Sequence, residues 1–138
     1  MPSRMAGPNV RAVDTNVIVR VLIDDPDEPG QTGAARELVR RERTVLVPDL
    51  VLIEMTWVLR TSYRFSRAMV AKAVQGLIAH GKLVLESEAQ AAAALKLYES
   101  SQADYADCWI LASMRERGVE LVTFDQKLAR LEGTLQLE

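Results

Sequence analysis

An acid, a hydroxyl and an amide follow one another where the first apolar run of the chain ends. Ala12-Val13 leads into Asp14-Thr15-Asn16. In α/β proteins, oxygen ligands at the end of a buried strand lie where a cation or a phosphate group is commonly bound. Asp14 is therefore the first candidate ligand, and the strength of this assignment depends on whether other acids converge on it.

A second acid, Glu54, falls within the apolar stripe of a helix predicted over 49–61. The other members of that stripe are Leu50, Ile53, Trp57 and Val58. An ionised carboxylate in an apolar setting costs several kcal/mol unless a cation or hydrogen-bond donors compensate it. A functional role for Glu54 is one explanation. A salt bridge to Arg60 or Arg20, or an edge position from which the carboxylate reaches water, is the alternative.

A third acid, Asp107, shares a predicted helical face with apolar side chains. That face consists of Asp107, Ile110, Leu111 and Met114. Its position predicts a ligand role, although an acid in the first turn also complements the helix dipole. Asp104 is a good N-cap for the same helix, and Asp107 three residues later makes a carboxylate version of the capping box, so capping remains the alternative for Asp104.

The end of a late predicted strand repeats the opening pattern. Residues 119–123 form an apolar run that ends in Thr123-Phe124-Asp125. Asp125 is a further candidate ligand, with the alternative that it only caps a short helix over 126–131. Since parallel strands share one carboxyl edge, we expect Asp14, Glu54, Asp107 and Asp125 to meet there. Mutual repulsion of four carboxylates implies a hard divalent cation, Mg²⁺ or Mn²⁺, and His and Cys are too scarce to favour zinc.

The elements that position these acids alternate between strand and helix, which predicts an α/β fold with a mainly parallel sheet. The predicted strands cover 11–17, 44–47, 82–85, 119–123 and 134–137. The predicted helices are a short one after 17, then 31–43, 49–61, 66–80, 88–100, one from Asp104 to Gly118, and 126–131. We expect a single domain over 1–138, with residues 1–10 as a flexible extension.

Composition excludes several classes of function. The 138 residues are 49% hydrophobic and 26% charged, as in ordinary globular proteins, and no apolar run is long enough to span a bilayer. A single cysteine, Cys108, excludes an intramolecular disulfide and fits a buried thiol in a reducing cytoplasm. With a net charge of only −2, binding to a nucleic acid would require a local basic strip or bridging metal ions.

Taken together, the four acidic motifs resemble those of the PIN domain. The resemblance covers the chain from about Arg11 to Leu137. More narrowly, the chain is similar to the VapC-type toxins of type II toxin-antitoxin systems. This resemblance implies a three-layer α/β/α sandwich with a mainly parallel four- to five-stranded sheet. It also implies a homodimer, cleavage of RNA with Mg²⁺ or Mn²⁺, and inhibition by a small VapB-like antitoxin that blocks the active site.

The resemblance assigns roles to individual residues. Asp14, Glu54 and Asp107 match the acidic triad, and Asp125 matches a fourth acid that often holds the metal through water. The matching polar positions are Thr15, Asn16 and Thr123, while Asp104 occurs in only part of the family. We also expect Arg60, Arg64 and Arg67 to line the path of the RNA, with a solvated charged face as the alternative.

Two other functions are compatible with the same residues. One is a phosphatase or phosphotransfer enzyme with an aspartyl nucleophile at Asp14, although Asn16 stands where such an enzyme would need a second acid. The other is a binding module whose acids form an electrostatic surface without catalysis.

Overall fold

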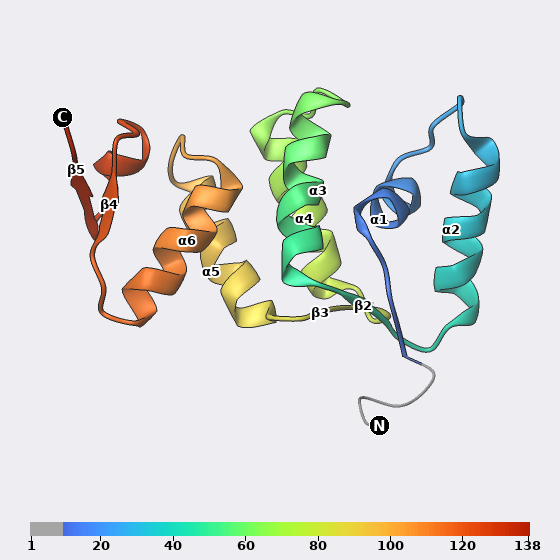
Figure 1. Ribbon diagram of the computed structural model, residues 1–138. Helices are drawn as coiled ribbons and strands as arrows, with labels where there is room; N and C mark the ends of the chain where they lie inside the picture. Colours follow the sequence, from blue (N-terminus) through green and yellow to red (C-terminus); the bar gives the residue numbers. More distant parts are fainter. Residues whose placement is uncertain (1–9) are drawn as a thin grey trace.

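The computed structural model describes residues 10–138, so most of the extension expected over 1–10 lies outside the described residues. Helices joined by short strands make up this part of the chain (Figure 1). The helices are α1 (Thr15–Leu22), α2 (Pro29–Arg41), α3 (Asp49–Thr61), α4 (Arg67–Ala79), α5 (Glu88–Glu99), α6 (Tyr105–Glu116) and the 3₁₀ turn η1 (Leu128–Arg130). The strands are β1 (Arg11–Ala12), β2 (Val45–Val47), β3 (Leu83–Leu85), β4 (Leu121–Thr123) and β5 (Thr134–Gln136).

The predicted α/β class is confirmed, since every strand pair in the described chain is parallel. The five strands that we expected in one sheet are divided between two. One sheet has the order β1-β2-β3, and the other contains only β4 and β5. Figure 1 shows β4 and β5 beyond α5 and α6, at the opposite end of the molecule from α1 and α2.

β1 is shorter than the predicted strand over 11–17. Asp14 adopts an extended conformation and its side chain accepts a hydrogen bond from the Val17 amide at 3.0 Å, which makes it the N-cap of α1. Thr15 and the residues after it are therefore helical. The prediction was wrong here because β-branched residues following Asp14 suggest a strand, whereas the capping carboxylate starts a helix.

The buried face of α3 also differs from the predicted stripe. Its buried residues are Leu52, Met55, Thr56 and Leu59. Leu50 and Trp57, which we placed on the core side, are 75% and 64% exposed, and Glu54 lies on the exposed side with them. Apolar residues surround most of this helix, so periodicity alone did not identify the face that packs against the core.

The helix α6 packs through a face next to the predicted one. Tyr105, Cys108, Leu111 and Ala112 are buried, whereas Ile110 is largely exposed. The expectation of a buried Cys108 thiol is confirmed. Asp107 consequently lies half-buried at the border of the packed face. Among the described residues, no helix combines the length and hydropathy that crossing a membrane requires.

Candidate active site

Asp14, Thr15 and Glu54 form a first acidic group at the carboxyl end of β1. The Thr15 hydroxyl donates a hydrogen bond to Glu54 Oε1, which joins the start of α1 to α3. One oxygen of Asp14 accepts the Val17 amide as a helix cap. The site therefore contains two carboxylates on separate elements, and the Thr15 hydroxyl, next to Asp14 in the chain, binds the second of them.

The predicted salt bridge of Glu54 does not form with either proposed partner. Arg20 lies 3.5 Å from Asp25 and donates to the Tyr63 hydroxyl at 2.8 Å. Arg60 donates to the Phe65 carbonyl at 2.9 Å. Because both arginines are engaged elsewhere, the salt-bridge alternative for Glu54 is wrong, and the edge position of this carboxylate is the one observed.

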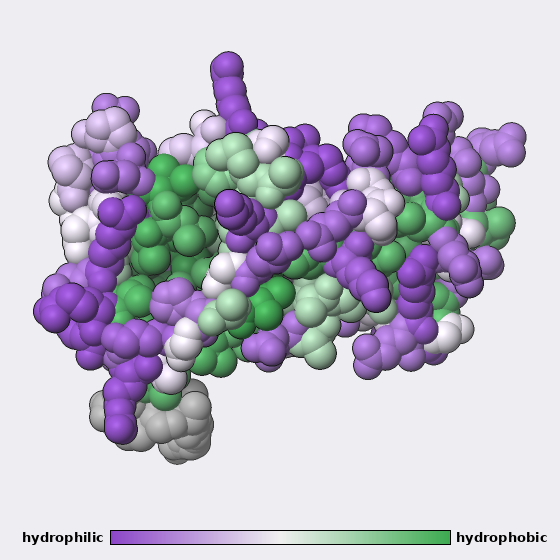
Figure 2. Space-filling view, turned by 180° about the vertical axis from the view of Figure 1, so that it is seen from behind, coloured by the Kyte–Doolittle hydropathy of each residue, from purple (hydrophilic) through white to green (hydrophobic). Residues whose placement is uncertain are grey.

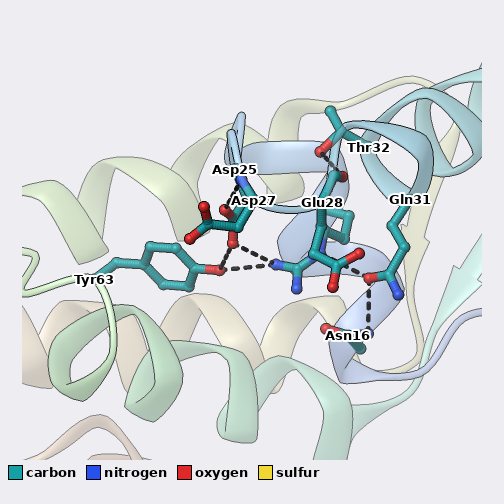
Figure 3. Close-up of polar contacts among 8 residues, drawn as sticks. Asn16, Asp25, Asp27, Glu28, Gln31, Thr32 and Tyr63 are labelled. Atoms are coloured by element: carbon teal, nitrogen blue, oxygen red, sulfur yellow. Dashed lines mark hydrogen bonds and ion pairs between the residues drawn. The ribbon is translucent and has the colours of Figure 1, made fainter.

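A polar network beside the first acidic group holds Asn16 (Figure 3). The Asn16 amide lies 3.5 Å from Gln31 Oε1, which also accepts a hydrogen bond from Arg20 at 3.0 Å. The Tyr63 hydroxyl in turn donates to Asp25. This network connects α1, α2 and the loop after α3, so it fixes the start of α1 and with it the position of Asp14. The sequence analysis did not identify this network.

Asp104, Asp107 and Asp125 form a second acidic group at the start of α6 and the end of β4. Burial raises the pKa of Asp107, and the neighbouring charges of Asp104 and Asp125 raise it further. Asp104 occupies the N-cap position, but its side chain makes no capping hydrogen bond. The alternative that Asp104 caps the helix through its side chain is therefore wrong, and this residue lines the same cavity as Asp107.

Asp125 does cap the turn that follows it. Its Oδ1 accepts hydrogen bonds from the amides of Lys127 at 2.8 Å and Leu128 at 3.0 Å. The Thr123 hydroxyl accepts one from the Asp125 amide at 2.9 Å. The amides of Lys127 and Leu128 hold one carboxylate oxygen of Asp125, and the Thr123 hydroxyl holds its main chain.

A cavity of about 870 Å³ opens between α3 and the start of α6. Glu54 from the first acidic group and Asp107 from the second both line it, and Arg60 and Arg64 lie on its wall. The exposed side chains of Leu50 and Trp57 also line this cavity. It therefore combines acids, bases and an apolar surface, as expected of a site that binds a large ligand.

The acids of the two groups are not gathered around a single point in the described part of the chain. Over residues 10–138, no three of the His, Cys, Asp and Glu side chains lie close enough together to hold one ion. The oxygen donors themselves suit Mg²⁺ or Mn²⁺, and burial together with the charges of Asp104 and Asp125 raises the pKa of Asp107. The chemistry of the donors fits a divalent ion, but each group alone is incomplete.

Arg67, which we had placed on the RNA path, instead organises the chain leading to Asp104. Its guanidinium donates to the carbonyls of Tyr98 and Ala103 at 2.8 Å, of Ser101 at 3.1 Å and of Gln102 at 3.4 Å. It also lies 3.8 Å above the centre of the Tyr98 ring. With its donors committed to the backbone, we no longer include Arg67 among the RNA-binding residues.

The fold and the acids define a class of protein. The family model described as "PIN domain" matches residues 11–133, and this chain belongs to the PIN domain family. The resemblance deduced from the acidic motifs is thereby confirmed.

The chain is similar to two VapC proteins. It is 25% identical over 124 residues to a VapC ribonuclease of Aquifex aeolicus (strain VF5), covering 88% of this chain and 92% of that one. It is also similar to the crystal structure of Mycobacterium tuberculosis VapC20, a toxin that cleaves the sarcin-ricin loop. That match has 18% identity, a TM-score of 0.41, and covers 94% of this chain and 99% of the other.

Asp107→Asn is expected to stabilise the metal-free protein at neutral pH. The pKa of Asp107 is raised on folding above the ordinary value of 3.8, so the folded chain binds the proton more tightly than the unfolded chain. The resulting loss of folding stability is absent below pH 3.8. It develops as the pH rises through the raised pKa of Asp107, and it is complete above that pKa. Thermal melts in EDTA from pH 3.5 to 7.5 should show a higher melting temperature for the variant at pH 7 and a shrinking difference on acidification. A constant difference, or the same gain in the exposed control Asp24→Asn, would contradict this prediction.

Proposed function

We propose that this protein is a ribonuclease toxin that hydrolyses RNA phosphodiester bonds with Mg²⁺ or Mn²⁺. Membership of the PIN domain family and similarity to a VapC ribonuclease support the class of reaction. The observation with the most weight is the composition of the two acidic groups. Their carboxylates come from four separate segments of the chain. A phosphatase with Asp14 as nucleophile lacks such support, since Asn16 is bound to Gln31.

Asp14 and Asp107 would hold the divalent ion with the help of Asp125, and Glu54 would lie at a second ion. A divalent ion at this position supplies positive charge that polarises the phosphate and activates water. Thr15 orients Glu54 through their hydrogen bond, and Thr123 orients Asp125. Because the attacking group is water, the expected products have a 5′-phosphate and a 3′-hydroxyl.

Arg60 and Arg64 are the basic residues that we assign to the RNA. Both line the cavity with Glu54. Arg64 adopts a positive φ of 56°, which L residues other than Asn and Asp rarely adopt, so the loop holds this side chain at some conformational cost. Trp57, 64% exposed on the same wall, provides an aromatic surface on which an RNA base can stack.

The same cavity suits a small antitoxin. A segment with one basic and one apolar side chain would place the cation near Glu54 or Asp107 and the apolar group on Leu50 or Trp57. Binding there would block access of RNA to the acids, which is the mode of inhibition that we propose for a VapB-like partner. We further propose that the protein is a cytoplasmic homodimer.

Metal dependence tests the proposed function directly. Purified protein is incubated with end-labelled RNA after treatment with EDTA, and then with Mg²⁺, Mn²⁺ or Ca²⁺ added back. We expect cleavage to stop in EDTA and to return with Mg²⁺ or Mn²⁺. Mapping of the termini should give 5′-phosphates, and cleavage that persists in EDTA or leaves 2′,3′-cyclic phosphates would refute the proposal.

A further inference from the structure

A polar hollow lies where the loop between α5 and α6 faces η1, away from the cavity beside α3 (Figure 1). Its volume is about 410 Å³. Two exposed cations line it, Lys127 just before η1 and Arg130 at the end of η1. The loop contributes the uncharged side chains of Ser100, Ser101 and Gln102. The polar hollow therefore combines positive charge with hydrogen-bonding groups, which suits a phosphate group.

The cations of the polar hollow are not neutralised by the protein itself. Among residues 10–138, neither Lys127 nor Arg130 takes part in an ion pair. Glu99 is the only acid among the described residues that line the hollow, and it accepts a hydrogen bond from Gln75 of α4 at 2.8 Å. This bond holds the Glu99 carboxylate toward α4. Both cations are therefore available to an anion from outside the protein.

The backbone on both sides of the polar hollow is held in place. Arg67 binds the loop between α5 and α6 through four backbone carbonyls. On the other side, the Asp125 carboxylate accepts the amides of Lys127 and Leu128, and the Leu128 side chain is buried. A ligand of this surface does not have to order the backbone, which lowers the entropic cost of binding. The same bonds fix the start of the Lys127 side chain beside the second acidic group.

The second acidic group lies between two sets of cations. Asp107 lines the cavity beside α3 together with Arg60 and Arg64, whereas Asp125 precedes Lys127 of the polar hollow by two residues. In Figure 1, the loop after α3, the loop between α5 and α6, and η1 all lie along the upper edge of the molecule. Figure 2 shows hydrophilic side chains projecting from this edge. A strand of RNA laid along it would meet cations, then acids, then cations again.

We propose that Lys127 and Arg130 bind phosphates of the RNA on the opposite side of the cleaved bond from Arg60 and Arg64. Contacts on both sides hold that bond against the acids, whose own charge repels it. With a net charge of −2, the protein attracts RNA only through such local cations. Lys127 and Arg130 are positioning residues and take no part in the chemical step. This inference rests on the proposed ribonuclease function, but RNA binding at the hollow is measurable without cleavage.

The salt dependence of RNA binding tests this proposal. The wild type and the double variant Lys127→Gln/Arg130→Gln are titrated into a fluorescein-labelled single-stranded RNA in EDTA, at a series of KCl concentrations. Two lost phosphate contacts should reduce the slope of log affinity against log salt by about 1.4, at about 0.7 for each contact. The control, Arg43→Gln/Arg117→Gln, removes the same charge from exposed positions before β2 and after α6, at the opposite edge, and should keep the wild-type slope.

Cleavage kinetics separate this inference from the proposed function. In Mg²⁺, Lys127→Gln/Arg130→Gln should raise KM several-fold and leave kcat unchanged, because the two cations bind the ground state and the transition state alike. A wild-type KM or a wild-type salt slope in this variant, an equal change in the control, or a wild type that binds no RNA overturns the inference. If the slope changes as expected but the wild type cleaves no RNA in Mg²⁺, the proposed function is rejected and the RNA-binding surface is retained.

Discussion

Asp107→Asn is expected to lower the rate of RNA cleavage by at least about 100-fold, since even residues that only support metal ligands cost about 10- to 100-fold when replaced. The amide keeps the size of the side chain but loses the negative charge that attracts a divalent ion. Asp14→Asn should have the same effect from the first acidic group. Initial rates on end-labelled RNA at saturating Mg²⁺ measure both losses.

The control for this prediction is Glu116→Gln, an exposed acid at the last turn of α6. It removes the same charge from the same helix, far along the axis from Asp107, and should cleave RNA at the wild-type rate. Circular dichroism spectra should be unchanged in all three variants. Full activity of Asp107→Asn or Asp14→Asn would show that the acids are not the catalytic groups.

Arg67→Ala is expected to reduce the free energy of unfolding by about 2 to 4 kcal/mol, because charge-assisted hydrogen bonds to four carbonyls disappear together. The segment before Asp104 would lose its anchor, so the second acidic group should become less ordered and RNA cleavage should fall as well. Urea denaturation followed by circular dichroism gives the stability, and cleavage assays well below the transition give the activity.

Arg67→Lys separates charge from geometry. A lysine retains the positive charge, but its ammonium group lacks the planar set of N–H donors with which the guanidinium binds four carbonyls. The stability of Arg67→Lys should therefore lie between those of the wild type and Arg67→Ala. Lys72→Ala, an exposed change on the same helix, serves as the surface control. If Arg67→Ala unfolded at the wild-type urea concentration, the hydrogen bonds would not be contributing as described.

Local chemistry made much of the fold predictable. Ser66 caps α4 by accepting the Met69 amide, as expected from a hydroxyl before a helical run. His80 accepts the amides of Lys82 and Leu83, in keeping with its predicted place at a helix end. Such features depend on a few neighbouring residues, so the sequence contains the information that they require.

Features that depend on distant packing were not predictable in the same way. Glu54 reaches the cavity, but from the exposed side of α3 and not from a buried stripe, because an all-round apolar helix does not specify its buried face. The four carbonyls bound by Arg67 have no signature in the sequence. The division of the strands into two sheets is likewise a long-range property that alternating strands and helices leave open.

The exposed indole of Trp57 makes occupancy of the cavity visible by fluorescence. Trp57 is 64% exposed on the wall that also contains Glu54 and Asp107. A ligand that covers this ring removes water from it, so the emission should shift to shorter wavelength as the cavity fills. The intrinsic emission of the protein therefore reports binding at the cavity without any label.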